Sequence, residues 1–325
     1  MSSKERILRD GIEKFLRHKE ERNESPVTIR NYRGVLIRLM IALMAARMTT
    51  NLKKIGKAEL LYLKDEYLTC GESTRKWTMD VLTGYCKWAG NTEIKNVFLL
   101  YGDTIRKNVG WLEPDQIPVL DANSQGIEKL VIHLEKDLGL RRIEVLRLNL
   151  SSFDFNGRGY GRLTVHGKGR KGGKYRTITC HPRTRTLFQE YVHGLRAEEN
   201  ARVRNAKPRT TITDHLFVYG NIKSGIVGEY KKTAMDKIAQ RVSDRVGFHF
   251  TNHDLRRTCG REMYFAGVEI EKIATILGHT DTRTTMKYLG LEFVNMEDSM
   301  KRYYEHQQQQ MHVCPENGAK VLLAR

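Results

Sequence analysis

A helical repeat of apolar residues runs through almost all of the first 100 residues and constrains the fold more than any other feature. Ser25-Pro26 supplies an N-cap and a proline suited to a first helical turn, and Gly71 and Gly90 mark expected helix ends. The pattern predicts a bundle of four amphipathic helices. Its faces are marked by Ile7, Ile12, Phe15, Leu16, Ile29, Val35, Leu36, Leu39, Leu43, Trp77, Val81, Tyr85 and Trp88.

The period changes from helix to strand in residues 162–166 and 175–180, where the side chains alternate. The segment between them, HGKGRKGG, fits G-x-G-x-x-G, which in a dinucleotide-binding fold would open a helix. No helical pattern follows, so two strands and a glycine-rich loop predict a β-hairpin and no nucleotide cofactor. The cations expected at or beside its tip are Lys168, Arg170, Lys171 and Lys174.

The segment 101–111 loses periodicity and is expected to be a linker between two domains. Helical signals resume at residue 112, strand-like pieces fill 151–180, and helices are expected from there to about residue 290. The tail 291–325 contains one further helical pattern. The fold class is therefore mainly α with a small antiparallel β-sheet (α+β), in two domains.

The formal net charge of +18 favours a polyanionic partner, either nucleic acid or an anionic membrane surface, and nucleic acid is the leading one. The longest apolar stretch, residues 39–46, is too short to span a bilayer, and the charged N-terminus shows no secretory signal. Five cysteines without C-x-x-C spacing argue against structural zinc or a disulfide framework. We expect a cytoplasmic, nucleoid-associated protein with no membrane partner and no bound metal.

Four short stretches carry residue types suited to chemistry on a phosphate. They are residues 139–144 (GLRRIE), the hairpin with Lys168, residues 253–256 (HDLR), and residues 277–279 (LGH), followed nine residues later by Tyr288. Taken singly, each has an ordinary structural explanation, such as a helix salt bridge, a solvated turn, a helix cap or aromatic packing. Their combination is far more specific than any one of them.

In this order the stretches resemble the signature of the tyrosine recombinase (phage integrase) family. That signature is an arginine in G-L-R-x-x-E, a lysine on a β-hairpin, H-x-L-R, L-G-H and a tyrosine nine residues after that histidine. Residues 112–290 resemble the family's catalytic domain. Residues 28–32 (TIRNY) look like its core-binding domain, which implies a SAM-like helical DNA-binding domain in 1–100. The six matching positions are Arg141, Lys168, His253, Arg256, His279 and Tyr288.

The resemblance implies a metal-free transesterification in which Tyr288 attacks DNA and forms a 3′-phosphotyrosyl intermediate. Arg141 and Arg256 would bind the nonbridging phosphate oxygens, an assignment that suits guanidinium groups independently of the family. His279 and His253 would add hydrogen bonds, and His253 is also a candidate acceptor of the tyrosine proton. Lys168 would protonate the departing 5′-oxygen, with Lys171 as its rival.

The remaining expectations concern support and partners. Glu144 would orient Arg141, and Arg170, Lys171 and Lys174 would hold the DNA backbone. The family resemblance implies a tetramer on two DNA sites, with a tail helix around 293–304 that packs either in its own protomer or in a neighbour. Accessory DNA-bending proteins are possible partners.

The biological role expected is integration or excision of a mobile element, with DNA inversion and chromosome-dimer resolution as alternatives. Two other functions share part of this pattern: a type IB topoisomerase, which has the same tyrosine chemistry, and a DNA-binding protein without catalysis. A non-catalytic protein has no use for both arginines, both histidines and Tyr288 together. The separate helical N-terminal domain and modest length favour recombination over topoisomerase activity.

Overall fold

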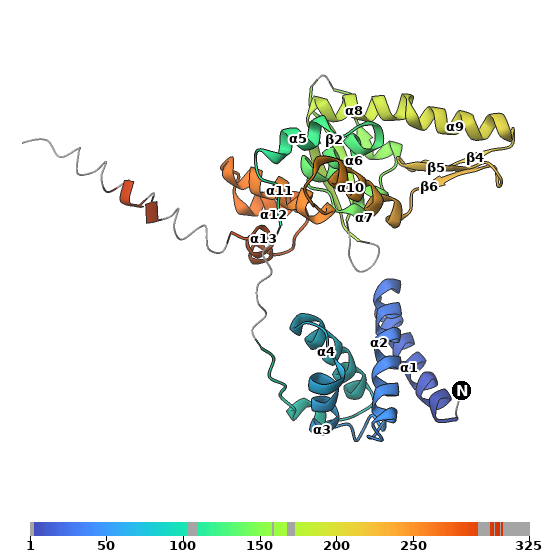
Figure 1. The fold of residues 1–325 in the computed structure, drawn as a ribbon, viewed down its shortest axis with the longest axis vertical. Coiled ribbons are helices and arrows are strands. Elements are labelled where there is room, and N and C mark those ends of the chain that lie inside the picture. The colour runs from blue at the N-terminus through green and yellow to red at the C-terminus, as the bar shows by residue number, and fades with distance from the viewer. Residues whose placement is uncertain are drawn as a thin grey trace, which may run out of the picture. The chain divides into compact units, whose positions relative to one another are not determined.

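A computed structural model describes residues 3–102, 110–157, 159–167, 173–291, 300, 301, 303–305 and 307 (Figure 1). The chain divides into two compact units, one formed within residues 3–102 and the other within residues 110–291. Most described elements are helices and the strands are short, which confirms the expected fold class. Among the described residues no helix combines the length and the apolar character needed to cross a membrane.

The first unit is helical throughout. Ser25 caps its second helix, because its hydroxyl accepts a hydrogen bond from the Thr28 amide at 3.1 Å. The expected third helix begins as an α-helix and continues with π-helical geometry. The elements are α1 (Ser3–Glu21), α2 (Pro26–Ala45), α3 (Lys57–Leu61), the π-helix Tyr62–Tyr67, α4 (Glu72–Trp88) and a short 3₁₀ helix (Glu93–Asn96).

The apolar faces of α1, α2 and α4 form the core of the first unit. Phe15 packs against Tyr85, with ring centroids 5.1 Å apart, and Leu36 is fully buried between the helices. The faces predicted from periodicity are largely confirmed, but Ile7, Trp77 and Trp88 remain substantially exposed. These three lie at the margins of the faces, where the helix surface turns toward solvent.

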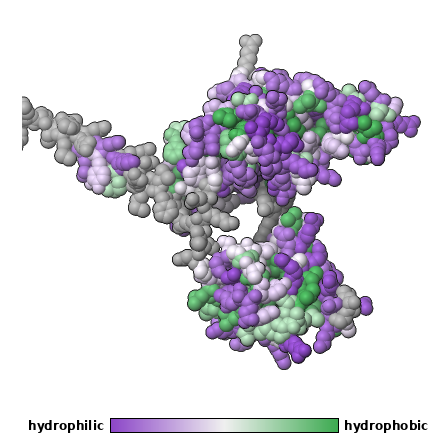
Figure 2. All heavy atoms as spheres, in the orientation of Figure 1, coloured by the Kyte–Doolittle hydropathy of each residue, from purple (hydrophilic) through white to green (hydrophobic). Residues whose placement is uncertain are grey.

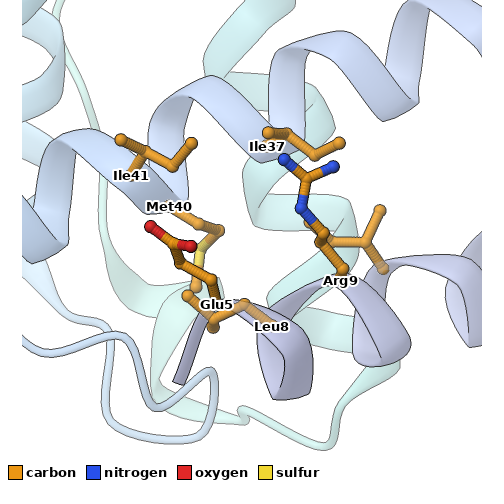
Figure 3. Close-up of a pocket in the computed structure, with 7 residues that line it drawn as sticks. Glu5, Leu8, Arg9, Ile37, Met40 and Ile41 are labelled. Carbon is orange, nitrogen blue, oxygen red and sulfur yellow. The ribbon is translucent and has the colours of Figure 1, made fainter. Parts of the chain in front are cut away.

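A shallow apolar groove lies between α1 and α2 (Figure 3). Leu8 and Ile12 line it from α1, and Ile37, Met40 and Ile41 line it from α2. The charged side chains Glu5 and Arg9 border it on the α1 side. Its lining is mostly aliphatic, so it offers no arrangement of groups suited to proton transfer or phosphate binding.

The second unit places helices around two small sheets. Its helices are α5 (Gln116–Ala122), α6 (Gly126–Lys136), α7 (Arg142–Leu146), a 3₁₀ helix (Leu150–Ser152), α8 (Pro182–His193), α9 (Leu195–Ala206), α10 (Lys232–Val246), α11 (Asn252–Phe265), α12 (Ile270–Leu277) and α13 (Thr282–Leu289). Hydrophilic residues cover most of the face of this unit seen in Figure 2.

The first sheet contains the predicted hairpin. Strands β1 (Phe153–Asp154), β2 (Gly161–His166) and β3 (Tyr175–Cys180) pair antiparallel in that order, with Val165 opposite Arg176. Leu163 and Val165 point into the core from β2, as do Ile178 and Cys180 from β3. The described residues on both sides of the loop belong to strands, because residues 173 and 174 lead directly into β3, as the hairpin prediction requires.

The second sheet corrects the expectation that helices alone follow residue 180. Strands β4 (Thr211–Ile212), β5 (Val218–Asn221) and β6 (Ile226–Glu229) form a sheet of order β4-β6-β5, with β4 parallel to β6. Val218 and Val227 pack against Val203 of α9. The strands are too short for a strand period to stand out in the sequence, and their stability comes from this packing on α9.

Asn91 joins two segments of the first unit through hydrogen bonds of its side chain. Its buried Nδ2 donates to the carbonyls of Leu52 and Ile55 at 2.7 and 2.8 Å, and its Oδ1 accepts from the amide of Ile94 at 3.0 Å. The side chain therefore fixes the loop before α3 to the segment after α4. The sequence offered no sign of this role.

We predict that Asn91→Ala lowers the free energy of unfolding of the first unit by about 1–3 kcal/mol, because buried carbonyls and an amide lose their partners. Denaturant unfolding of the full chain, followed by tryptophan fluorescence, measures the change. Asn51→Ala is the control, since Asn51 lies exposed in the same loop. Equal losses in both variants would contradict the role given to Asn91.

Candidate active site

Glu144 is the buried centre of the site. Arg141 is the N-cap residue of α7, and Glu144 in the first turn accepts from the Arg141 amide at 2.8 Å and from its Nη1 at 2.9 Å. The Nη2 of Arg141 donates to the carbonyl of Gly278 at 3.0 Å. The Arg141 side chain remains partly open to solvent, so its guanidinium is oriented without being enclosed.

The charge on Glu144 is held by its neighbours. Burial alone would raise the pKa of this carboxyl group, but hydrogen bonds and charge from Arg176, together with the amide of Arg141, lower it to about 2. Arg256 adds a further ion pair at 3.6 Å. One carboxylate is thus shared by three arginines, and the surrounding pocket keeps excess positive charge.

Helix α11 delivers Arg256 and His253 to the same pocket. Thr251 and Asp254 form a capping box, in which the Thr251 hydroxyl accepts from the Asp254 amide and Asp254 accepts from the Thr251 amide at 2.8 Å. The same short stretch of sequence therefore caps α11 and supplies two residues of the site. His253 lies in the first turn, exposed as a residue but with its ring partly buried, and Arg256 follows on the inner side of the helix.

Arg256 is almost completely buried, and backbone carbonyls fix its orientation. Its Nη1 donates to the carbonyl of Gly139, and its Nη2 donates to the carbonyl of Leu277. Gly139 has φ +63°, and a Cβ there would lie 2.7 Å from a Leu277 methyl carbon. Glycine at this position therefore allows the close approach that aims Arg256.

His279 follows the left-handed Gly278 that ends α12, with its ring beside Arg256. Burial, then the charges of Arg256 and Arg141, lower the pKa of His279 to about 4, so the ring is neutral at neutral pH. Its Nδ1 lies 2.9 Å from the hydroxyl of Thr285, which is fully buried. The Thr285 hydroxyl also donates to the carbonyl of Asp281 at 3.5 Å, and Nη2 of Arg256 lies 3.4 Å from Nε2, so these contacts favour a proton on Nδ1. Donation from Nε2 to a phosphate oxygen requires the other tautomer, in which the Thr285 hydroxyl donates to Nδ1.

Tyr288 lies near the end of α13, close to the arginines and His279. Its ring centroid is 5.1 Å from that of His279, 6.0 Å from Cζ of Arg256 and 4.9 Å from Cζ of Arg257. Its hydroxyl donates to the carbonyl of His253 at 3.2 Å. Burial raises the pKa of the phenol, while the charges of Arg256 and Arg257 oppose that rise.

Partial burial and the neighbouring arginines lower the pKa of His253. This favours the neutral imidazole, which can accept a proton. The structure thus brings together Arg141, Glu144, Arg256, His279, Tyr288 and the backbone of His253. Lys174 lies beside β3, outside these contacts. Lys168, Arg170 and Lys171 lie outside the described residues, as do residues 292–299 of the tail and 103–109 of the linker.

Sequence reasoning missed Arg176, Thr285 and Arg257. Arg176 binds Glu144 through two nitrogens, Thr285 contacts His279, and Arg257 donates to the carbonyl of Tyr288 at 2.8 Å. A signal for Arg176 was present, because it shares the alternating inward face of its strand with Ile178 and Cys180. A charged residue in phase with a buried strand face indicates a buried ionic partner.

The family model described as the phage integrase family matches residues 110–293. Tyrosine recombinase XerA of Saccharolobus solfataricus is 26% identical over 187 residues, which cover 57% of this chain and 54% of that protein. Transposase A from transposon Tn554 of Staphylococcus aureus is 26% identical over 196 residues, which cover 58% and 51%. The chain spans about half the length of these curated relatives.

Two solved structures share the fold. One is XerH site-specific recombinase bound to difH substrate, with a TM-score of 0.63 at 20% identity, covering 89% of this chain and 83% of that one. The other is the Tn1549 transposon integrase in complex with transposon right end DNA, with a TM-score of 0.62 at 16% identity, covering 91% and 99%. At these identities the likeness is one of fold.

Glu135 of α6 is a second buried carboxyl group behind the site. Its Oε2 accepts from Nδ2 of Asn252 at 2.8 Å, while Oε1 is buried without a hydrogen-bond partner among the described residues. Burial raises its pKa from 4.5 to about 8, against the hydrogen bond from Asn252 and the charges of Arg142 and Arg256. Glu135 is therefore mainly protonated at neutral pH.

We predict that Glu135→Gln removes a pH-dependent loss of stability. The folded chain disfavours ionised Glu135. The stability that the protonated side chain contributes is therefore fully present below pH 4.5 and is lost as pH rises toward about 8. The unfolding free energies of wild type and variant should agree near pH 4.5, and the variant should be the more stable of the two above about pH 8. A constant difference across this range would contradict the assignment.

Proposed function

Because the chain belongs to the phage integrase family, we propose that it is a tyrosine-type site-specific recombinase that cuts and rejoins double-stranded DNA. The observation that carries the proposal is the convergence of Tyr288, two guanidinium groups and a neutral histidine on one pocket. Neither a purely structural role nor simple DNA binding requires a tyrosine hydroxyl beside these groups.

The proposed reaction begins with binding of one phosphodiester by Arg141, Arg256 and His279. A pentacoordinate phosphorus carries extra negative charge on its nonbridging oxygens, and fixed cations stabilise that charge more than the ground state. Hydrogen bonds from Arg141 to Glu144, and from Arg256 to the carbonyls of Gly139 and Leu277, hold the two arginines before DNA binds. The site therefore needs little reorganisation during the reaction.

In the chemical step the Tyr288 oxygen forms a bond to phosphorus while the bond from phosphorus to the 5′-oxygen breaks. The products are a 3′-phosphotyrosyl link and a free 5′-hydroxyl. The phenol proton passes to a nearby base, for which His253 is the candidate, and Lys168 supplies a proton to the 5′-oxygen. Rejoining reverses these transfers with a 5′-hydroxyl as the nucleophile, so the phosphodiester energy is conserved.

The finer role we propose is integration or excision of a mobile element, in line with the transposase and transposon integrase among the similar proteins. DNA inversion and chromosome-dimer resolution are the alternatives. A tetramer would bring two DNA sites together, and Arg170, Lys171 and Lys174 would hold the backbone near the hairpin. These assignments suit a protein with net charge +18.

We predict that wild type forms a denaturant-resistant covalent adduct with DNA in EDTA and that Tyr288→Phe forms none. The variant lacks the attacking oxygen but keeps the charged groups, so its DNA affinity and salt dependence should persist. Labelled duplexes tiled across the DNA that flanks the gene, each nicked near candidate sites, provide the substrates. The nick traps the adduct because the short product strand diffuses away.

Several outcomes would count against the proposal. An adduct with Tyr288→Phe would remove Tyr288 from its role, and cleavage that appears only after Mg²⁺ is added would replace the mechanism. Relaxation of supercoiled plasmids that lack any recombination site would favour a type IB topoisomerase. DNA binding without cleavage on an exhaustive set of duplexes would favour a binding protein.

A separate prediction concerns Lys168. Lys168→Ala should slow cleavage of an ordinary duplex by roughly 10²–10⁴-fold, the usual contribution of a general acid. A substrate with a 5′-bridging phosphorothiolate has a leaving group that needs no proton, so the same variant should cleave it at nearly the wild-type rate. Lys171→Ala is the matched comparison, and an equal loss for Lys168→Ala on both substrates would reject the assignment.

A further inference from the structure

Arg176 is committed to the interior of the protein, although it lies on a strand that leads to the hairpin tip. It occupies the inward face of β3 opposite the fully buried Val165, and its side chain is only 13% exposed. Nη1 and Nη2 donate to the two oxygens of Glu144 at 2.9 Å each, and Nε donates to the carbonyl of Ile276 at 2.8 Å. Every nitrogen of the guanidinium thus binds a group of the protein.

These contacts connect three separate parts of the site. Glu144 also orients Arg141, and Ile276 lies three residues before His279 at the end of α12. A Cβ on Gly278 would lie 3.1 Å from Nη1 of Arg176 and 3.4 Å from Nη1 of Arg141. The turn that precedes His279 therefore rests directly against both guanidinium groups.

We infer that Arg176 is a positioning residue for the cleavage step, holding Arg141 through Glu144 and His279 through the end of α12. The inference rests on the proposed function, because it concerns the same pocket. Arg176 itself does not contact the phosphate in this assignment, because its Nε and both Nη atoms donate to Glu144 and Ile276, whereas Arg256 uses only its two Nη atoms and its Cζ lies 6.0 Å from the ring centroid of Tyr288. Its effect is to fix the distance between two phosphate-binding groups that come from different elements.

The planar fork of arginine is essential to this role. Arginine binds both carboxylate oxygens while its Nε reaches a third group, whereas lysine is a single point charge on a flexible chain. Arg176→Lys keeps the positive charge near Glu144 but cannot hold both Glu144 and the carbonyl of Ile276 in this geometry. The variant therefore separates positioning from charge.

The test compares single-turnover adduct formation by wild type, Arg176→Lys and Arg202→Lys on the duplex that traps wild type. Arg202 is a matched control, because it binds Glu199 through two nitrogens and the carbonyl of Gly220 through one, away from the site. Rate constants are measured at saturating DNA, alongside burst amplitude, DNA affinity and thermal melting. A loss of folded protein lowers the amplitude, whereas poor positioning lowers the rate constant.

We expect Arg176→Lys to lower the rate constant by roughly 10²-fold, the scale of a small misplacement of reacting groups. Its burst amplitude and DNA affinity should resemble those of Arg202→Lys, which should cleave like wild type, whereas its melting temperature should be lower because a buried ion pair is weakened. A wild-type rate constant in Arg176→Lys, or an equal loss in Arg202→Lys, would overturn the inference. A wild type that forms no adduct would overturn the proposed function itself.

A second comparison keeps the inference testable if Arg176→Lys folds poorly. Glu144→Gln and the double variant Glu144→Gln, Arg176→Gln both remove the buried carboxylate, and the double variant also removes its main counter-ion. With Arg176→Gln measured alone as well, the double variant should be slower than Glu144→Gln, because the contact with the carbonyl of Ile276 is also lost, but less slow than the product of the two single losses. Single losses that multiply fully would show that Arg176 does not act through Glu144 and would overturn the inference.

Discussion

The ion pairs of buried Glu144 are the interaction on which the rest of the site depends. A fully buried carboxylate is unfavourable unless cations and hydrogen bonds surround it, and here three arginines from α7, β3 and α11 do so. Each of those elements comes from a different part of the second unit. The requirement to satisfy one charge therefore holds together a helix start, a strand and a second helix at the place where the phosphate-binding groups meet.

The site combines the fixed positive charges of arginines with a neutral histidine ring that can form hydrogen bonds. Arg256 remains charged, because even its lowered pKa, about 10, lies well above neutrality. The same positive field lowers the pKa of His279 and keeps that ring uncharged. The arginines thus attract an anion, and the histidine orients it through a directional hydrogen bond.

Much of this arrangement could be predicted from sequence because it depends on local spacing. Arg141 and Glu144 are three residues apart, and side chains alternate along the two hairpin strands. Both features could therefore be predicted without tertiary information. Arg176, Thr285 and the carbonyl of Gly139 act on residues far along the chain or across a turn. The strands 211–229 escaped prediction because packing on α9 sustains them, and short segments carry little period of their own.

The helix that carries Tyr288 is fastened through its main chain as well as through the buried side chains of Thr285 and Leu289. Arg257 donates to the carbonyl of Tyr288, and Arg261 donates to the carbonyl of Leu289 at 2.8 Å. A carbonyl is the same whichever side chain its residue bears. The exposed positions of α13, such as Arg283, Thr284 and Lys287, are consequently free to diverge during evolution without moving the tyrosine. This helix can acquire new surface chemistry, and new contacts with other molecules, while its reactive residue stays in register.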